Sequence, residues 1–159
     1  MLTISLGENL PASDVWAVAR GEKVKLKFGR AAQARVRESR SEIEKIVEAG
    51  KPVYGVNTGF GLLASESIPL KDVSTLQSNL LLSHAVGSGP DMPEQEKRLA
   101  LLLRMHSLCK GNSGVRPRLI RWFMRLFELG WLPRVPEQGS VGACGDLDPL
   151  AHLALPVIG

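Results

Sequence analysis

Hydrophobic and polar positions alternate near the start of this chain and follow a helical period later. The alternation covers residues 2–6 and returns over 24–28, where apolar side chains are interleaved with lysines. A period of two predicts half-exposed strands. Between them, residues 13–19 have apolar positions at helical spacing, with Ser13 as the expected N-cap and Gly21 as the stop. The pattern predicts a small α/β unit.

Helical spacing dominates the rest of the chain. Apolar side chains recur at three- and four-residue intervals within residues 30–49, and Gly50 ends that pattern. Asp91 is a candidate N-cap for a later helix, and Asp148 for the last one, with Pro149 at its first position. These later helices are expected over residues 76–86, 93–109, 117–129 and from 148 onward.

The predicted fold class is mainly α, with a small α/β N-terminal portion. We expect one domain portion over residues 1–159, in which 1–70 form the α/β part and 71–159 form the helices. The last helix is almost entirely apolar and requires burial between other helices that this sequence does not supply. This mismatch indicates a fragment of a larger fold.

Composition excludes several classes of function. Apolar residues make up 44% and charged residues 23% of the chain, which excludes a disordered tail. The net charge of +4 comes from basic residues interleaved with glutamates, so no nucleic-acid partner is expected. The apolar stretches fall short of the roughly 18 residues of a membrane span. Two cysteines without a leader favour the cytoplasm, and no metal-ligand spacing is present.

Two glycine-rich loops are candidates for chemistry: residues 54–61 and 139–146. In the second, three glycines at a spacing of three allow tight turns. The loop also leads into a helix start, where free N–H groups can support an anion or an electron sink. Spacing alone does not separate such a site from an ordinary turn, and neither loop matches a phosphate-binding motif.

Both loops resemble sequence motifs of a known enzyme family. The run Gly139-Ser-Val-Gly-Ala-Cys-Gly-Asp-Leu-Asp-Pro-Leu-Ala-His152 resembles the signature of the aromatic amino-acid ammonia-lyases, and the loop beginning at Tyr54 resembles a second motif of that family. Matches over 76–87 and 110–116 extend the resemblance along the whole chain. It implies the N-terminal portion of the family's fold, in which the small α/β part leads into a long-helix bundle that is incomplete here. It also implies a homotetramer, or association with a chain that supplies the C-terminal portion, with active sites shared between subunits.

The resemblance also implies an electrophilic prosthetic group. In the family, methylidene-imidazolone forms autocatalytically from Ala-Ser-Gly, which is Ala143-Cys144-Gly145 here. The Gly145 nitrogen attacks the Ala143 carbonyl, and Cys144 loses hydrogen sulfide where serine would lose water. Asp146 is tied in relatives to formation of this group, which takes the place of a metal or a diffusible cofactor. Without the resemblance, Cys144 would be a small packing residue or a thiolate nucleophile.

By the same resemblance, Tyr54 and His84 act on the substrate. Tyr54 removes the β-proton, a role for which a phenol needs nearby positive charge or hydrogen bonds to its phenolate. Ser83 followed by His84 resembles the histidine-specific members, because an imidazole can exchange a hydrogen bond with another imidazole. Taken alone, Tyr54 would be a packing residue and His84 a hydrogen-bonded core residue.

Other motif residues are expected to be structural or to depart from the family pattern. His152 lies on the last, apolar helix and is interpreted as structural. Asp148 stands where relatives usually have alanine, His106 where they commonly have asparagine, and Asn112 where an aromatic residue or histidine is common. A carboxylate near the electrophile could lower its electron affinity, although at a helix start it could be benign.

The expected function is non-oxidative deamination of L-histidine to trans-urocanate and ammonia. An alternative is a tyrosine ammonia-lyase or an aminomutase with the same prosthetic group. A third hypothesis is a non-catalytic segment or pseudoenzyme subunit that only associates with a partner chain.

Overall fold

The N-terminal part is a small parallel β-α-β unit. In the computed structural model, which describes residues 1–143 and 145–159, strand β1 (Leu2–Ser5) pairs in parallel with β2 (Val24–Lys27). Helix α1 (Ala12–Ala19) connects them, as a parallel pair requires. Ile4 lies opposite Leu26, and both are buried. The two strands and the helix predicted from the pattern are confirmed.

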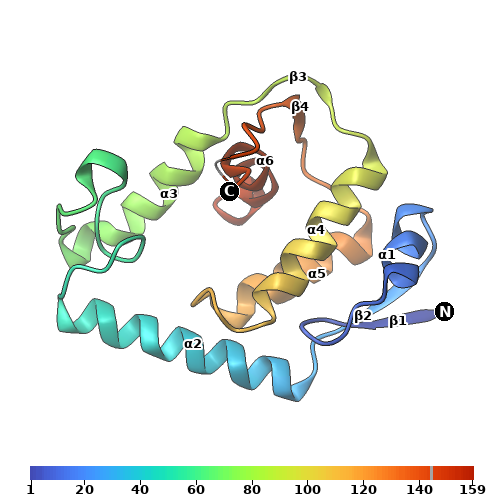
Figure 1. Ribbon diagram of the computed structural model, residues 1–159, viewed down its shortest axis with the longest axis horizontal. Coiled ribbons are helices and arrows are strands. Elements are labelled where there is room, and N and C mark those ends of the chain that lie inside the picture. The colour runs from blue at the N-terminus through green and yellow to red at the C-terminus, as the bar shows by residue number, and fades with distance from the viewer. Residues whose placement is uncertain (144) are drawn as a thin grey trace.

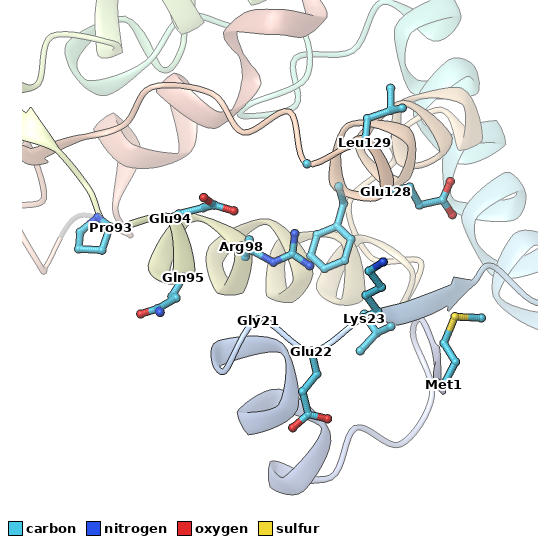
Figure 2. Close-up of a pocket in the computed structure, with 13 residues that line it drawn as sticks. Met1, Gly21, Glu22, Lys23, Pro93, Glu94, Gln95, Arg98, Glu128 and Leu129 are labelled. Carbon is cyan, nitrogen blue, oxygen red and sulfur yellow. The ribbon is translucent and has the colours of Figure 1, made fainter.

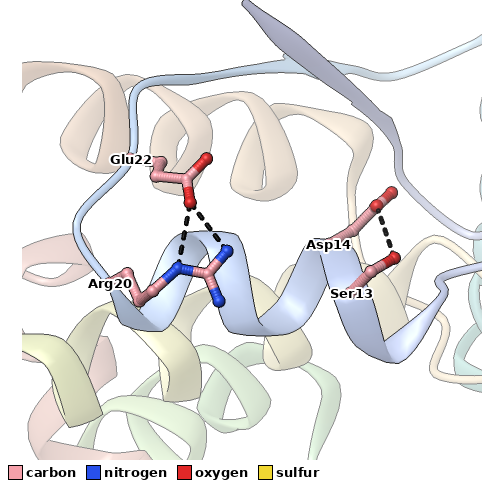
Figure 3. A network of polar contacts seen from close by, with 4 residues as sticks. All are labelled: Ser13, Asp14, Arg20 and Glu22. Atoms are coloured by element: carbon pink, nitrogen blue, oxygen red, sulfur yellow. Dashed lines mark hydrogen bonds and ion pairs between the residues drawn. The ribbon is translucent and has the colours of Figure 1, made fainter.

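The start of α1 differs from the prediction. Pro11, not Ser13, occupies the N-cap position, and it makes no side-chain cap bond. The Ser13 hydroxyl instead donates to Asp14 Oδ1 at 3.3 Å, and beyond the helix Arg20 pairs with Glu22 at 2.7 Å (Figure 3). Ser13 is already inside the helix, so its hydroxyl cannot reach the first free N–H groups. Exposed contacts of this kind add little to stability.

The core forms where the α/β unit meets two central helices. Helix α4 (Glu94–Leu108) packs against α5 (Pro117–Leu129), and α1 packs on α4 (Figure 1). Helix α2 (Arg30–Ala49) runs along one side and contacts α5. The buried core side chains are Ile4, Leu6, Val18, Leu26, Ala32, Val36, Leu101, Leu102, Met105, Leu108, Cys109, Ile120, Phe123, Leu126 and Phe127. The predicted mainly α class is confirmed, and none of the described helices is long and apolar enough to cross a membrane.

A second pair of helices lies beside this core. Helix α3 (Val73–His84) packs against α6 (Leu147–Ala154), with short 3₁₀ turns before and after them. These turns cover Gly61–Leu63, Leu70–Asp72 and Leu155–Val157. The prediction of Asp148 as N-cap was wrong, because Asp146 takes that position in a left-handed conformation and its carbonyl accepts the Leu150 N–H. Asp148 is the second residue of the helix and is buried.

A short second sheet was not expected. Strand β3 (Ser88–Asp91) pairs antiparallel with β4 (Pro136–Gln138). Asp91 is not the N-cap of α4, since Pro93 holds that position. Its Oδ2 lies 2.5 Å from Lys97 Nζ, and its Oδ1 accepts the Val135 N–H at 2.9 Å. Val135 lies 44 residues along the chain from Asp91, so no local pattern around Asp91 could have predicted that contact.

The Asp91–Lys97 pair should make stability depend on pH. The hydrogen bond from Lys97 lowers the pKa of Asp91 from its ordinary value of 3.8, and the Val135 N–H adds to this. A lowered pKa stabilises the fold above the ordinary pKa, and the contribution is lost as pH falls through the lowered value. We expect Asp91→Asn to lower the urea midpoint at about pH 7 and to have a smaller effect near pH 3.

The matched control is Glu22→Gln, which breaks the exposed pair with Arg20. It should change the midpoint little at either pH, because both of its side chains are solvated. An Asp91→Asn effect that is equal at both pH values would contradict the assigned cause.

Candidate active site

The glycine-rich loop between β4 and α6 is shaped by two local turns. Gly142 has a φ of 72°, and around it the Ala143 N–H donates to the Val141 carbonyl at 2.8 Å. This is a three-residue turn, which other residues adopt only with strain. The Gly142 N–H donates to Ser140 Oγ at 3.2 Å. Ala143 is exposed in this loop.

Asp146 closes this loop from the other side. The Ser140 hydroxyl donates to Asp146 Oδ1, so the two contacts of Ser140 bridge the residues on both sides of Cys144. Asp146 has a φ of 56°, a left-handed conformation that non-glycine residues rarely adopt outside strained or functional segments. Sequence reasoning identified Asp146 but missed Ser140, because nothing in the spacing shows that their side chains meet.

The described residues around the tripeptide fit a methylidene-imidazolone. Gly145 has a φ of 78°, and no atom lies within 4 Å of the place where its Cβ would be. Ala143 and Gly145 are both exposed, so none of the described side chains encloses the Gly145 nitrogen or the Ala143 carbonyl. Cys144, which was predicted to supply the leaving group, lies outside the described residues.

His84 is held in one orientation at the end of α3. Its Nδ1 lies 2.7 Å from the Leu80 carbonyl oxygen. Since a carbonyl oxygen only accepts, Nδ1 carries the hydrogen, and the neutral ring keeps a lone pair on Nε2. In the described part of the chain, no hydrogen bond engages Nε2 of this side chain. His84 can therefore accept a hydrogen bond from a ligand.

The segment after His84 is fastened to α6, the helix that follows the glycine-rich loop. The Val86 N–H donates to Asp148 Oδ1 at 2.8 Å, and the Gly87 N–H donates to His152 Nε2 at 3.2 Å. Figure 1 shows the end of α3 passing beside α6. The structure thus places the end of α3, with His84, beside the helix that follows residues 139–146, which we call the prosthetic-group loop because the tripeptide predicted to form that group lies in it.

Tyr54 lies on a separate loop. The residue is 64% exposed, and its ring meets the Phe60 ring edge-on, with centroids 5.7 Å apart. Asn57, a buried residue that sequence reasoning did not single out, shapes this loop. Its Oδ1 accepts the Val53 N–H at 2.8 Å, and its Nδ2 donates to the Lys51 carbonyl at 3.0 Å. The Asn57 side chain therefore bridges the residues before Tyr54.

Within this chain, Tyr54 and His84 are not brought together. The segment 51–70 leads into the start of α3, whereas His84 is the last residue of that helix (Figure 1). Its 12 residues at about 1.5 Å each give a helix length of about 18 Å. Among the described residues, no hydrogen bond joins Tyr54 to residues 139–146.

Three pockets lie away from His84 and from residues 139–146. The first, of about 850 Å³, is lined by Met1, by the segment that joins α1 to β2, by the start of α4 and by the end of α5, with the Arg98 guanidinium 4.4 Å above the Phe127 ring (Figure 2). Charges of both signs surround it, including Glu22, Lys23 and Glu128. The second, of about 750 Å³, is lined mainly by α5, and the third, of about 490 Å³, by α2, the start of α3 and residues 113–116. None of the three is lined by His84 or by the described residues of 139–146, whereas Gly55 and Val56 of the Tyr54 loop line the third.

Comparison with known proteins identifies the class of this chain. A family model described as aromatic amino acid lyase matches residues 10–159, so the chain belongs to the aromatic amino acid lyase family. It is 49% identical over 153 residues to a histidine ammonia-lyase of Anaeromyxobacter dehalogenans, covering 96% of this chain and 30% of that protein. The chain thus spans about 30% of the length of the curated relatives that it matches.

Solved structures show the same fold. The crystal structure of histidine ammonia-lyase from Trypanosoma cruzi matches with a TM-score of 0.88 at 36% identity, covering 99% of this chain and 30% of that one. A tyrosine aminomutase from Streptomyces globisporus matches with a TM-score of 0.89 at 35% identity, again over 99% and 30%. The observed architecture is therefore an incomplete portion of the family's fold, as expected.

Proposed function

We propose that this chain is the N-terminal part of an enzyme that deaminates L-histidine to trans-urocanate and ammonia without oxidation. The observation that carries the proposal is the orientation of His84, whose Nδ1 is engaged by Leu80 while the Nε2 lone pair is left for a ligand. The segment after His84 is held to the helix that follows the Ala143-Cys144-Gly145 loop. The 49% identity to proteins named histidine ammonia-lyase supports the same substrate.

His84 would recognise the substrate side chain. An imidazole N–H of histidine can donate to Nε2 of His84, whereas a phenyl ring offers no donor and would leave that acceptor unpaired. Sites built around such a hydrogen bond reject analogues that lack it. A phenol hydroxyl can also donate to Nε2, and the likeness to a tyrosine aminomutase supports a tyrosine substrate as the second candidate.

The Ala143-Cys144-Gly145 tripeptide would hold the electrophile. Its closure joins the Gly145 nitrogen to the Ala143 carbonyl carbon with loss of one water, and Cys144 loses one hydrogen sulfide to leave an exocyclic methylidene. The group supplies an electron sink that makes the amine a leaving group. Asp146 and Ser140 hold the loop around the tripeptide in the turn that this closure needs.

Tyr54 would take the β-proton of the substrate. Because Tyr54 lies on the segment that precedes α3 and His84 is the last residue of that helix, we propose that each serves a site completed by further chain or by another copy, as in a homotetramer. The exposed position of Tyr54 supports this arrangement, since its ring is available to a neighbouring surface. We place the enzyme in the cytoplasm, where a free thiol at Cys144 would stay reduced until closure.

Intact mass tests the prosthetic group directly. We expect the purified protein to be lighter than its sequence by one water and one hydrogen sulfide. Burial raises the pKa of Cys109 to about 11, so this thiol should resist alkylation in the folded protein at about pH 8. After unfolding, one thiol should react if the group has formed.

The same measurement can also contradict the prosthetic group. A protein at its full sequence mass, with two thiols alkylated after unfolding, would contradict the prosthetic group and favour a non-catalytic subunit. If the group is present, product analysis of the assembled enzyme separates urocanate from the products of tyrosine elimination or amino-group migration. Urocanate is the expected product.

A further inference from the structure

Two side chains of α6 converge on the backbone that follows His84. Asp148 and His152 are one helical turn apart, and their side chains are only 8% and 13% exposed. They accept hydrogen bonds from two successive N–H groups, those of Val86 and Gly87. Buried acceptors aimed at consecutive amides fix both the position and the direction of a chain segment.

The pair acts as two acceptors rather than as an ion pair. His152 Nε2 lies 3.5 Å from Asp148 Oδ1, a separation compatible with an ion pair if the ring were protonated. However, Nε2 accepts the Gly87 N–H at 3.2 Å, and a nitrogen that accepts carries no hydrogen. In this arrangement Nε2 of His152 is an acceptor, and the Asp148 carboxylate is directed to the Val86 N–H.

One hydrogen bond links Asp148 to the residue that would bind the substrate side chain. The Val86 N–H is shared between Asp148 Oδ1 at 2.8 Å and the His84 carbonyl at 3.0 Å. The second contact closes a tight turn around Ala85, whose φ of −83° and ψ of 68° are those of an inverse γ-turn. Asp148 thus holds the turn that ends α3 immediately after His84.

The same carboxylate packs against the beginning of the prosthetic-group loop. A Cβ at Gly139 would lie 1.8 Å from Asp148 Oδ2, and one at Gly87 would lie 2.7 Å from it. Both glycines leave room for the carboxylate. Among the described residues, Asp148 Oδ2 has no hydrogen-bond partner, so its burial is uncompensated. Packing alone would be served better by an apolar side chain.

We propose that Asp148 and His152 are positioning residues that set the place of His84 relative to the prosthetic-group loop. We call the pair of hydrogen bonds from the Val86 and Gly87 N–H groups to α6 the clamp, and it concerns only this chain. The effect of the clamp on substrate binding rests on the proposed function. Asp148 does not touch the substrate in this proposal. It holds the turn after His84 against the loop that begins at Gly139, so that substrate affinity depends on an acceptor at position 148.

Hydrogen exchange at single amides tests the clamp without any activity. In Asp148→Ala we expect exchange at the Val86 amide to rise about tenfold or more, because its acceptor on α6 is gone. Asp148→Asn keeps an oxygen at that place, and exchange should stay within about threefold of the original protein. His152→Leu should raise exchange at Gly87, with the Leu150 amide inside α6 as the internal reference for intact folding.

The consequence for the substrate is measured in the assembled enzyme. Asp148→Ala should raise KM for L-histidine about tenfold with kcat changed less than about threefold, and Asp148→Asn should restore KM. A merely structural role would lower the active fraction or the melting temperature and leave KM unchanged.

Two results would overturn the proposal. The first is unchanged exchange at Val86 in Asp148→Ala, or equal exchange in the Ala and Asn variants, since the acceptor would then not matter. The second is faster exchange at the Val86 amide of Asp148→Ala with an unchanged KM for L-histidine. The clamp would then not determine how His84 binds the substrate. An enzyme that forms no urocanate but still shows the predicted exchange would count against the proposed function and leave the clamp supported.

Discussion

Replacing Tyr54 with phenylalanine is expected to lower kcat for histidine deamination by about 10²- to 10⁴-fold, the usual contribution of a positioned general base. The change removes only the hydroxyl. Because Tyr54 is 64% exposed and contacts Phe60 through its ring, the fold should be unaffected. KM should change little, since the proposed substrate contact is made by His84. Steady-state kinetics of the assembled enzyme, with the urea midpoint measured in parallel, provide the test.

The matched control for Tyr54 is Phe60→Leu. It removes the edge-on ring contact and keeps the phenol. We expect a small loss of stability and a kcat within about tenfold of the original, because the ring of Tyr54 loses a neighbour while its hydroxyl remains. If Phe60→Leu and Tyr54→Phe lowered kcat equally, the loop conformation rather than the hydroxyl would be responsible.

The second large effect is expected at Gly139. An alanine there would place its Cβ 1.8 Å from Oδ2 and 2.5 Å from Cγ of Asp148, so one of the two segments must move. Forcing atoms into a packed site costs about 1–3 kcal/mol. In an Asp148→Ala background, the nearest remaining atom would be the Cβ of residue 148 at 3.3 Å. The double variant should therefore recover most of the stability lost in Gly139→Ala.

A double-mutant cycle from urea unfolding measures this coupling, which we expect to be about 1–3 kcal/mol. Gly142→Ala is the matched control, since Gly142 belongs to the same loop and no atom of the described residues lies within 4 Å of the place where its Cβ would be. Its φ of 72° should still make this change cost about 1–2 kcal/mol, because only backbone strain is involved. That loss should be the same whether residue 148 is aspartate or has been replaced by alanine. Additive effects for Gly139→Ala and Asp148→Ala would show that the carboxylate does not pack against this loop.

Local patterns predicted the helices well where glycine and proline mark their ends. Helix α2 begins at Arg30 and ends at Ala49 as predicted, because Gly50 takes the left-handed conformation that ends a helix. Helix α5 likewise begins at Pro117, which suits a first helical turn, and ends before Gly130. Where the stop signal was weak, as after His84, the predicted end at residue 86 was too late.

The errors share a physical cause. Ser13, Asp91 and Asp148 were all predicted as N-caps because short polar side chains favour that position. In each case another contact or position prevailed: Ser13 lies inside its helix, Asp91 pairs with Lys97, and Asp148 receives the Val86 N–H. The β3–β4 pairing was not predicted because the two strands lie far apart in the sequence, and a local pattern does not show which distant segment pairs with a strand.

The sequence by itself determined the family, the tripeptide and the candidate residues Tyr54 and His84, because these depend on residue types in local order. The fold class followed from hydrophobic periodicity, which the chain carries within each helix. Only the three-dimensional structure shows that Ser140 meets Asp146 within its loop, and tertiary packing alone decided that Asp148 joins the end of α3 to the loop that begins at Gly139. The Asp148 contact depends on how α3 and α6 pack in space, and no local pattern encodes the partner of a buried polar group.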